Sequence, residues 1–394
     1  MCSSDLPLAL EAYDNDSSDG WGDSAIRGFL VKELGGETFL AMAPDVPVNV
    51  LSSLKLAAYA YAIDEIDKDP SKLNSFVTWT QANADDPATS TNEVWDAECI
   101  PQGQGQEASA TWGDALPTMM WWSHNRTLDA FYDLFTTDSI NERMANKFGL
   151  KNTVVFPGCP TGGEYAPWAK NRTTMNDMSK LFESVNGGIF GEQATQAFYG
   201  NMLAMDPQTN PTAVSPYRGG AKLGPTESWS DMQRLRSMVI QEADAAGKYW
   251  LINNFWDNTR VYWKGGSGGP SWDEVGFATA EQISLPFYEN NQMKMRKFFV
   301  GFFVFKLITP DECKTSTPSA KCTSIQSAEN KDLQEFWGEL HRLIIRMAVK
   351  SWPSTPAFPS PSVSASPSPS ASPTPKPTSA SPTPSRSPSP PGTR

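Results

Sequence analysis

Histidine is scarce in this sequence of 394 residues, which contains only His124 and His341. Two imidazoles are too few for a histidine-rich metal site, and no cluster of cysteines and histidines has the spacing of a zinc site. A Ser-His-Asp triad is nearly excluded as well, because His341 falls in a predicted closing helix, where we expect a surface or capping role. We therefore expect neither a metal nor a cofactor.

Long apolar runs and a positive net charge are also missing. The longest apolar stretch, Phe298–Phe305, has the length of a strand and is far too short to span a membrane as a helix. The net charge is −12, so the basic surface that a nucleic acid partner requires is not expected. The first residues show no charged head followed by an apolar stretch, so no signal peptide is visible.

Three short motifs carry most of the chemical information. Ser52 and Lys55 form a Ser-x-x-Lys pair, whose spacing places an amine one helical turn from a hydroxyl whose proton it can share. Ser123 and Asn125 form a Ser-x-Asn pair, which adds a second hydroxyl and an amide. Lys264 precedes two glycines, which places a cation beside backbone that a ligand can approach closely.

The surroundings of the first motif strengthen it. The segment Leu51–Ile66 is apolar nearly all round, which predicts a buried helix, and the run stops before Asp69-Pro70. A serine and a lysine in the first turn of a buried helix are costly unless they are used or paired. Upstream, strand-like stretches at Ile26–Lys32 and Thr38–Met42 predict a hairpin that leads to this helix.

With these motifs, the sequence resembles the class A β-lactamase and penicillin-binding protein superfamily of active-site serine enzymes. The resemblance extends over about residues 26–352 and includes two strands after Lys264, at Glu274–Ala280 and Phe298–Ile308, and a closing helix near Lys331–Trp352. It implies a two-lobed α+β fold, in which an antiparallel sheet flanked by helices is built from both chain ends and a mainly helical lobe is inserted between them.

The same resemblance implies a division of the chain. The expected parts are an N-terminal extension at 1–25, a sheet lobe at about 26–50 and 215–352, a helical lobe at about 51–214, and a tail at 353–394.

The resemblance also implies a mechanism of acyl transfer on a β-lactam or related peptide amide. Ser52 would attack the carbonyl and Lys55 would take its proton, directly or through water. Ser123 would pass a proton to the departing nitrogen, Asn125 would orient Lys55 and bind the substrate amide, and Lys264 would hold the substrate carboxylate. The implied substrate-binding set is Asn125, Lys264, Gly265, Gly266 and Ser267, with the backbone N–H groups of Ser52 and Ser267 as the oxyanion hole.

Two departures from the family pattern qualify this mechanism. The family usually has Thr or Ser where this chain has Gly265, and that hydroxyl normally contacts the substrate carboxylate. Glu164 is the single acidic residue between Cys159 and Lys170, where the family has its deacylating glutamate, but it lies closer to Thr173 than the family pattern places it. Glu164 is therefore either the catalytic base of deacylation or an exposed loop glutamate.

Three functions remain open from the sequence. The leading prediction is a β-lactamase-like serine hydrolase that works through an acyl-enzyme on Ser52. A second is a penicillin-binding or D-Ala-D-Ala peptidase-like protein that acylates and deacylates slowly. A third is a non-catalytic wall or matrix glycoprotein that keeps the fold, which the glycine at position 265 and the tail would favour.

The tail and the cysteines concern location. From Pro353 onward the chain repeats Ser-Pro and Thr-Pro pairs, a composition that predicts disorder and resembles glycosylated wall-associated stalks as much as a plain linker. The spacings of Cys313 with Cys322 and of Cys99 with Cys159 are compatible with disulfides, although four free thiols remain an alternative. We expect an extracellular or cell-wall-associated protein, with wall or matrix association through the tail.

Overall fold

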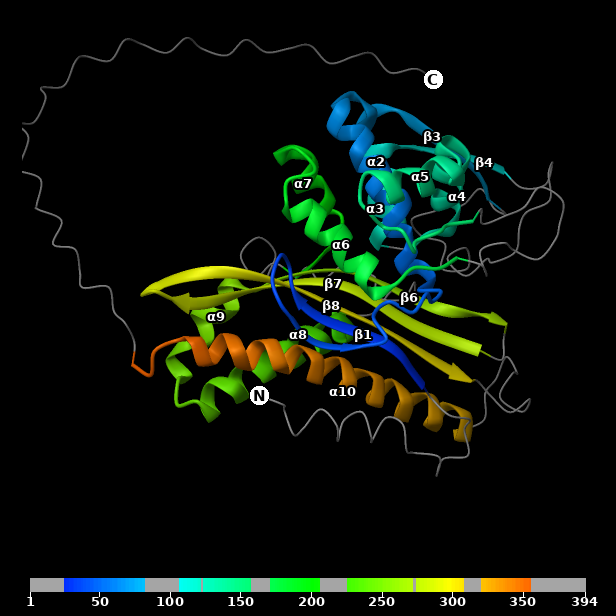
Figure 1. Cartoon of the computed structure of the whole chain (residues 1–394). Helices are drawn as coiled ribbons and strands as arrows, with labels where there is room; N and C mark the ends of the chain where they lie inside the picture. The colour runs from blue at the N-terminus through cyan, green and yellow to red at the C-terminus, as the bar shows by residue number, and fades with distance from the viewer. Residues whose placement is uncertain are drawn as a thin grey trace, which may run out of the picture. The chain divides into compact units, whose positions relative to one another are not determined.

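A computed structural model describes residues 25–81, 106–121, 123–156, 171–205, 225–271, 274–307 and 320–355. A six-stranded antiparallel sheet runs through the described part of the chain in the order β2-β1-β8-β7-β6-β5 (Figure 1). Its strands are β1 (Ala25–Glu33), β2 (Thr38–Met42), β5 (Leu203–Met205), β6 (Arg260–Ser271), β7 (Glu274–Glu289) and β8 (Gln292–Leu307). A separate hairpin consists of β3 (Phe76–Gln81) and β4 (Gln106–Thr111).

Helices cover both faces of the six-stranded sheet. Figure 1 shows α8, α9 and α10 on one face and the group from α2 to α7 on the other, which confirms the expected α+β fold. The first face carries α8 (Pro225–Ala245), α9 (Ile252–Asn258) and α10 (Ala320–Ser351). The second carries η2 (Leu51–Leu54), α2 (Lys55–Lys68), η3 (Pro70–Asn74), α3 (Trp112–Trp121), α4 (Asn125–Phe135), α5 (Thr137–Asn146), α6 (Met175–Asn186) and α7 (Glu192–Gly200), and the short η5 (Tyr249–Leu251) precedes α9.

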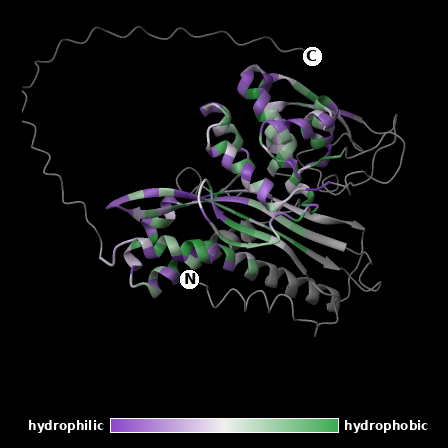
Figure 2. Ribbon diagram, viewed as in Figure 1, coloured by the Kyte–Doolittle hydropathy of each residue, from purple (hydrophilic) through white to green (hydrophobic). Residues whose placement is uncertain are grey.

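Strand alternation divides the interior into two cores. In β8, Phe299 and Phe303 join the core beneath α2, whereas Phe298, Val300 and Phe302 join the core beneath α10. Successive side chains of a strand point to opposite faces, so an uninterrupted apolar run marks a strand that is buried on both sides. The hydropathy colours of Figure 2 follow this arrangement, with apolar residues on the central strands and a hydrophilic end at the β7–β8 hairpin.

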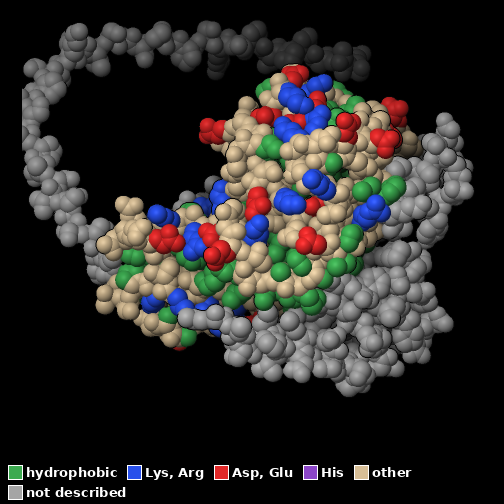
Figure 3. Space-filling view, in the orientation of Figure 1, with side chains coloured by type: hydrophobic (Ala, Val, Ile, Leu, Met, Phe, Trp, Pro, Cys, Tyr) green, Lys and Arg blue, Asp and Glu red, His purple; other side chains and the backbone are tan. Residues whose placement is uncertain are grey.

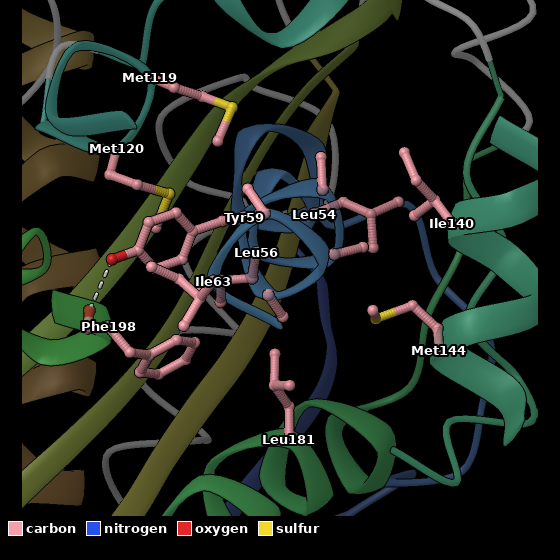
Figure 4. Close-up of a cluster of buried hydrophobic side chains, with 14 of the residues drawn as sticks. Leu54, Leu56, Tyr59, Ile63, Met119, Met120, Ile140, Met144, Leu181 and Phe198 are labelled. Carbon is pink, nitrogen blue, oxygen red and sulfur yellow. Dashed lines mark hydrogen bonds between the residues drawn. The ribbon is translucent and has the colours of Figure 1, made fainter. Parts of the chain in front are cut away.

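The helix α2 passes through the centre of the helical layer. Its side chains Leu56 and Ile63, and Leu54 of the preceding turn η2, are surrounded by residues of α3, α5, α6 and α7 (Figure 4). The Tyr59 hydroxyl donates a hydrogen bond of 2.9 Å to the carbonyl oxygen of Phe198. Burial on every side confirms the predicted buried helix and removes its first turn from water.

The structure refines several expected elements. The strands β7 and β8 extend to a tight turn at Asn290 and Asn291, which adopt positive φ of 52° and 62°. Asparagine tolerates that conformation better than most residues, so the strands continue past the ends that hydrophobicity alone suggests. The strand β5 lies inside the range expected for the helical lobe, yet it pairs with β6 of the sheet.

The expected surface or capping role of His341 is wrong. His341 is 1% exposed, and its Nε2 lies 2.9 Å from Oε1 of Glu281, whose other oxygen accepts a hydrogen bond from Trp337 Nε1. Glu281 lies on the strand face that otherwise packs apolar side chains against α10, so the buried carboxylate requires polar partners from that helix.

Helices long and apolar enough to cross a bilayer are not found in the described ranges. Nearly all of the expected N-terminal extension and tail lies outside those ranges, as do Cys2, Cys99, Cys159 and Cys313, so the division into parts and the disulfides stay predictions.

Candidate active site

Ser52 lies in a short 3-10 turn, η2, at the point where the chain enters α2. The preceding Leu51 has a φ of 54°, a left-handed conformation that costs energy for a residue with a side chain. The Asn49 side-chain oxygen accepts a hydrogen bond of 2.9 Å from the Leu51 N–H and so supports this bend. The half-buried Ser52 is thus held at a defined position before the helix begins.

Lys55 brings an amine to the Ser52 hydroxyl. Its Nζ lies 2.8 Å from Ser52 Oγ and 2.7 Å from Oδ1 of Asn125. The lysine is 3% exposed, and burial lowers its pKa to about 7, with the charge of Asp129 opposing the shift. An amine with this pKa is about half free at pH 7 and largely free above it, so it can accept a proton from Ser52.

The loop before α4 supplies Ser123 and Asn125. Ser123 has a φ of 57°, and His124 caps the helix by accepting a hydrogen bond of 3.2 Å from the Thr127 N–H at Nδ1. Burial, together with the positive charges of Lys55 and Arg126, lowers the pKa of His124 to about 4. His124 is therefore a neutral helix cap at physiological pH, and Asn125 begins the helix with its amide directed to Lys55.

Lys264 approaches the same site from strand β6. Its Nζ donates to Ser123 Oγ at 2.9 Å and to the Gly265 carbonyl at 2.8 Å. The side chain is 4% exposed, and burial together with the nearby charge of Lys55 holds the pKa of Lys264 well below its usual value. The second hydroxyl and the second amine are thus paired across two parts of the fold.

Strand β6 lies unusually close to the turn that carries Ser52. A Cβ added to Gly266 would lie 2.6 Å from the Val50 carbonyl oxygen and 2.7 Å from the Ser52 nitrogen. The neighbouring Ser53 hydroxyl donates to the Lys264 carbonyl at 3.0 Å, which ties η2 to β6. Glycine at position 266 is therefore required by space and not by backbone conformation.

Comparison with known proteins agrees with this constellation. Residues 22–215 match the model of the beta-lactamase enzyme family, a range that includes Ser52, Lys55, Ser123 and Asn125 and ends before Lys264. Over this range, which is just under half of the chain, the sequence is similar to that enzyme family. A comparison with curated proteins gave no match.

Solved β-lactamases are similar to this domain at low sequence identity. The class A enzyme from Bacteroides cellulosilyticus is 14% identical with a TM-score of 0.48, and the comparison covers 84% of this chain and 97% of that one. The chromosome-encoded enzyme of Vibrio parahaemolyticus is 13% identical with a TM-score of 0.49, covering 87% and 98%. The enzyme from Xanthomonas campestris is 14% identical with a TM-score of 0.49, covering 85% and 98%.

Gly265, which departs from the family pattern, lies against the side chain of its neighbour Trp263. A Cβ at position 265 would lie 2.2 Å from Cζ3 of Trp263, so the indole ring occupies the space of the missing side chain. A hydroxyl residue could not be placed there unless Trp263 moved. Among the described side chains, Lys264 and Ser123 are the polar groups paired at this end of the site.

The remaining predicted residues are less fully placed. The backbone of Ser267 pairs with Phe277 of β7, and its side chain is not described. Glu164 lies outside the described residues, so its role in deacylation stays a prediction. Groups of three or more side chains able to hold a metal ion are not found in the described part of the domain.

The sequence analysis overlooked Asp129. This residue lies one helical turn after Asn125 on α4, and its charge acts on Lys55. The signal was present in the sequence, because residues four apart on a helix share a face. The spacing alone does not indicate a role for Asp129, because the sequence does not show that this face of α4 is turned toward Lys55.

Proposed function

We propose that this domain hydrolyses the amide bond of a β-lactam or a related cyclic or linear amide through an ester on Ser52. The observation that carries the proposal is the contact of 2.8 Å between Lys55 Nζ and Ser52 Oγ, made by a lysine whose pKa is about 7. A free amine beside a hydroxyl is the arrangement that activates a serine nucleophile without histidine.

We assign each step of the proposed acylation to a residue of this site. Ser52 Oγ forms a bond to the carbonyl carbon while Lys55 accepts its proton, directly or through a water molecule. When the carbon–nitrogen bond breaks, Ser123 delivers a proton to the nitrogen, and the proton that Lys55 took from Ser52 replaces it. Lys264, whose Nζ lies 2.9 Å from Ser123 Oγ, holds that hydroxyl in place. The backbone N–H groups of Ser52 and Ser267 are the proposed donors to the oxyanion. Water then releases the acid and regenerates Ser52.

The direct test is mass spectrometry of the protein after incubation with a penicillin. We expect a mass increase equal to the lactam, located in the peptide that contains Ser52, and no such increase in Ser52→Ala. Absence of labelling and of turnover across several lactam classes would reject the enzyme and leave the binding-module alternative, a wall or matrix glycoprotein that keeps the fold. Labelling that persists in Ser52→Ala would reject this serine.

The rate of deacylation separates the β-lactamase-like hydrolase from the slow penicillin-binding alternative. If Glu164 activates the deacylating water, wild type turns over many times and Glu164→Gln accumulates the ester, since such base catalysis contributes about 10²–10⁴-fold. Unchanged turnover in Glu164→Gln would exclude this role. A wild type that releases one equivalent of product and stops would support the penicillin-binding alternative.

We infer further that the protein works outside the cytoplasm, as the cysteine spacing and the Ser/Pro/Thr tail suggest. Peptide mapping without reductant should recover Cys313 and Cys322 as one linked species, and the loss of such a short bridge should cost about 2–3 kcal/mol. Alkylatable thiols at both positions in material from the native host would contradict the bridge and the location.

A further inference from the structure

Among the described residues, the polar side chains that Lys55 contacts are two neutral groups, the Ser52 hydroxyl and the Asn125 amide. Neither can balance the ammonium charge that Lys55 gains when it accepts a proton. Of the acidic groups in the described ranges, Asp129 of α4 is the one whose charge acts on Lys55. Its place in the fold therefore bears on how Lys55 works, provided that the acylation proposed above takes place.

Asp129 is held on the face of α4 that also presents Asn125. The two residues are four positions apart and so lie one above the other on the helix. An oxygen of Asp129 lies 3.9 Å from the guanidinium of Arg126, a residue of the first turn of α4, and the Asp129 side chain is only 21% exposed. The carboxylate thus belongs to the same helix face as the amide that contacts Lys55, and it is largely removed from solvent.

The two groups ionise in the same pH range and oppose each other's shifts. Burial raises the pKa of Asp129 to about 6, while the charges of Arg126 and Lys55 pull it down and that of Asp133 pushes it up. Burial lowers the pKa of Lys55 to about 7, while Asp129 pulls it up. Lys264 on β6 and His124 at the start of α4 also face Lys55, and the charge of Lys55 lowers the pKa of both; His124, with a pKa of about 4, is neutral in this range.

We propose that Asp129 is a positioning residue of the acylation site, whose carboxylate stabilises the ammonium form of Lys55 and so sets how much free amine faces Ser52. Asp129 acts through Lys55 and does not touch the substrate. After proton transfer, the carboxylate stabilises the ammonium form of Lys55, which carries the proton that Ser123 later needs. Before proton transfer, the same carboxylate slows acylation at mildly acidic pH, because it lowers the fraction of Lys55 side chains that are free amines.

The first experiment is the pH dependence of acylation in Asp129→Asn, measured in a single turnover. Because the amide carries no charge, the acid limb should move to lower pH, and acylation at pH 6 should be roughly two- to fivefold faster than in wild type. Asp129→Glu should restore the wild-type limb. Asp133→Asn, one turn further along the same helix, should leave it in place. An acid limb unchanged in Asp129→Asn would overturn the proposal.

A second measurement uses the wild-type protein and needs no substrate. In protein labelled with ¹³C at the lysine ε carbons, the Lys55 signal should titrate near pH 7 and show a smaller inflection near pH 6, where Asp129 takes up its proton. A single inflection would overturn the proposal even if Asp129→Asn failed to fold. Failure of every lactam to label Ser52 would instead reject the proposed function, and the Lys55 titration would still decide whether Asp129 acts on the amine.

Discussion

Lys264 Nζ donates a hydrogen bond of 2.9 Å to Ser123 Oγ, although 141 residues separate the two in the sequence. The bond joins strand β6 of the sheet to the loop that precedes α4 in the helical layer. The proposed proton donor for the leaving nitrogen and the amine proposed to hold the substrate carboxylate are therefore positioned by one contact, which forms only when the two parts of the fold are packed together.

Replacement of Lys264 by Met tests that contact. The variant keeps the size of the side chain but removes the donor to Ser123 and the amine proposed to hold the substrate carboxylate, so kcat/KM for a lactam with a free carboxylate should fall about 10- to 100-fold. The matched control is Lys294→Met, on the exposed end of the β7–β8 hairpin, which should retain full activity. Equal kinetics of the two variants would show that Lys264 has no part in binding or proton transfer.

The acylation rate should depend on the protonation of Lys55. Because the free amine accepts the Ser52 proton and its pKa is about 7, the rate should rise as the pH increases through about 7 and then level off. Stopped-flow measurements with a chromogenic cephalosporin between pH 5 and 9 would give the limb. A limb near pH 4, the range of an ordinary carboxyl group, would point to a carboxylate base in place of Lys55.

Lys55 should also lower the stability of the protein at neutral pH. The folded pKa of about 7 lies below the unfolded value of 10.5, so the unfolded chain binds more protons between these values and stability rises with pH there. Lys55→Met loses two hydrogen bonds but removes the cost of burying the amine. Its free energy of unfolding at pH 7 should therefore be about 1–3 kcal/mol higher than that of wild type. Denaturant titrations should show that gain shrinking toward pH 10, and a constant difference would contradict the assignment.

Gly266→Ala should damage the site more than the fold. The added Cβ would contact the backbone of Val50, Ser52 and Ser53 and push η2 away from β6, and a displacement of about 1 Å can cost about 10²-fold in rate. Gly200→Ala, at a helical glycine with open space around its Cβ position, should leave activity unchanged. Wild-type kinetics in Gly266→Ala would mean that the close approach of β6 does not position Ser52.

A buried carboxylate on α2 should matter for stability alone. Asp64 is fully buried and ion-paired with Lys68 at 3.0 Å and with Arg143 and Lys147 of the α5 region. Basic and acidic side chains lie side by side on the visible surface of the helical layer (Figure 3). Asp64→Asn leaves three cations together, so the free energy of unfolding should fall by about 2–4 kcal/mol, against less than about 0.5 for the exposed Glu142→Gln. Chemical denaturation at low and high salt would measure both.

Local chemistry in the sequence determined much of this protein. The Ser-x-x-Lys spacing could be interpreted because helix geometry fixes which side chains meet within one turn, and Ser52 and Lys55 do meet. The strands could be predicted because a strand that is buried on both faces has an apolar run such as Phe298–Phe305. The Ser-x-Asn and Lys-Gly-Gly motifs could be predicted as parts of one site through their resemblance to a family, since neither has a local partner.

Tertiary structure decided what those residues can do. Residues far apart in the sequence remove Lys55 from water, and this burial, which no motif encodes, gives the amine a pKa near neutrality. The same holds for His341, which pairs with Glu281 across 60 residues, and for Asp129, whose face of α4 turns toward Lys55 only after the helices pack. Spacing along the chain fixes contacts within a turn, whereas desolvation and charge coupling depend on which distant surfaces exclude water from the same place.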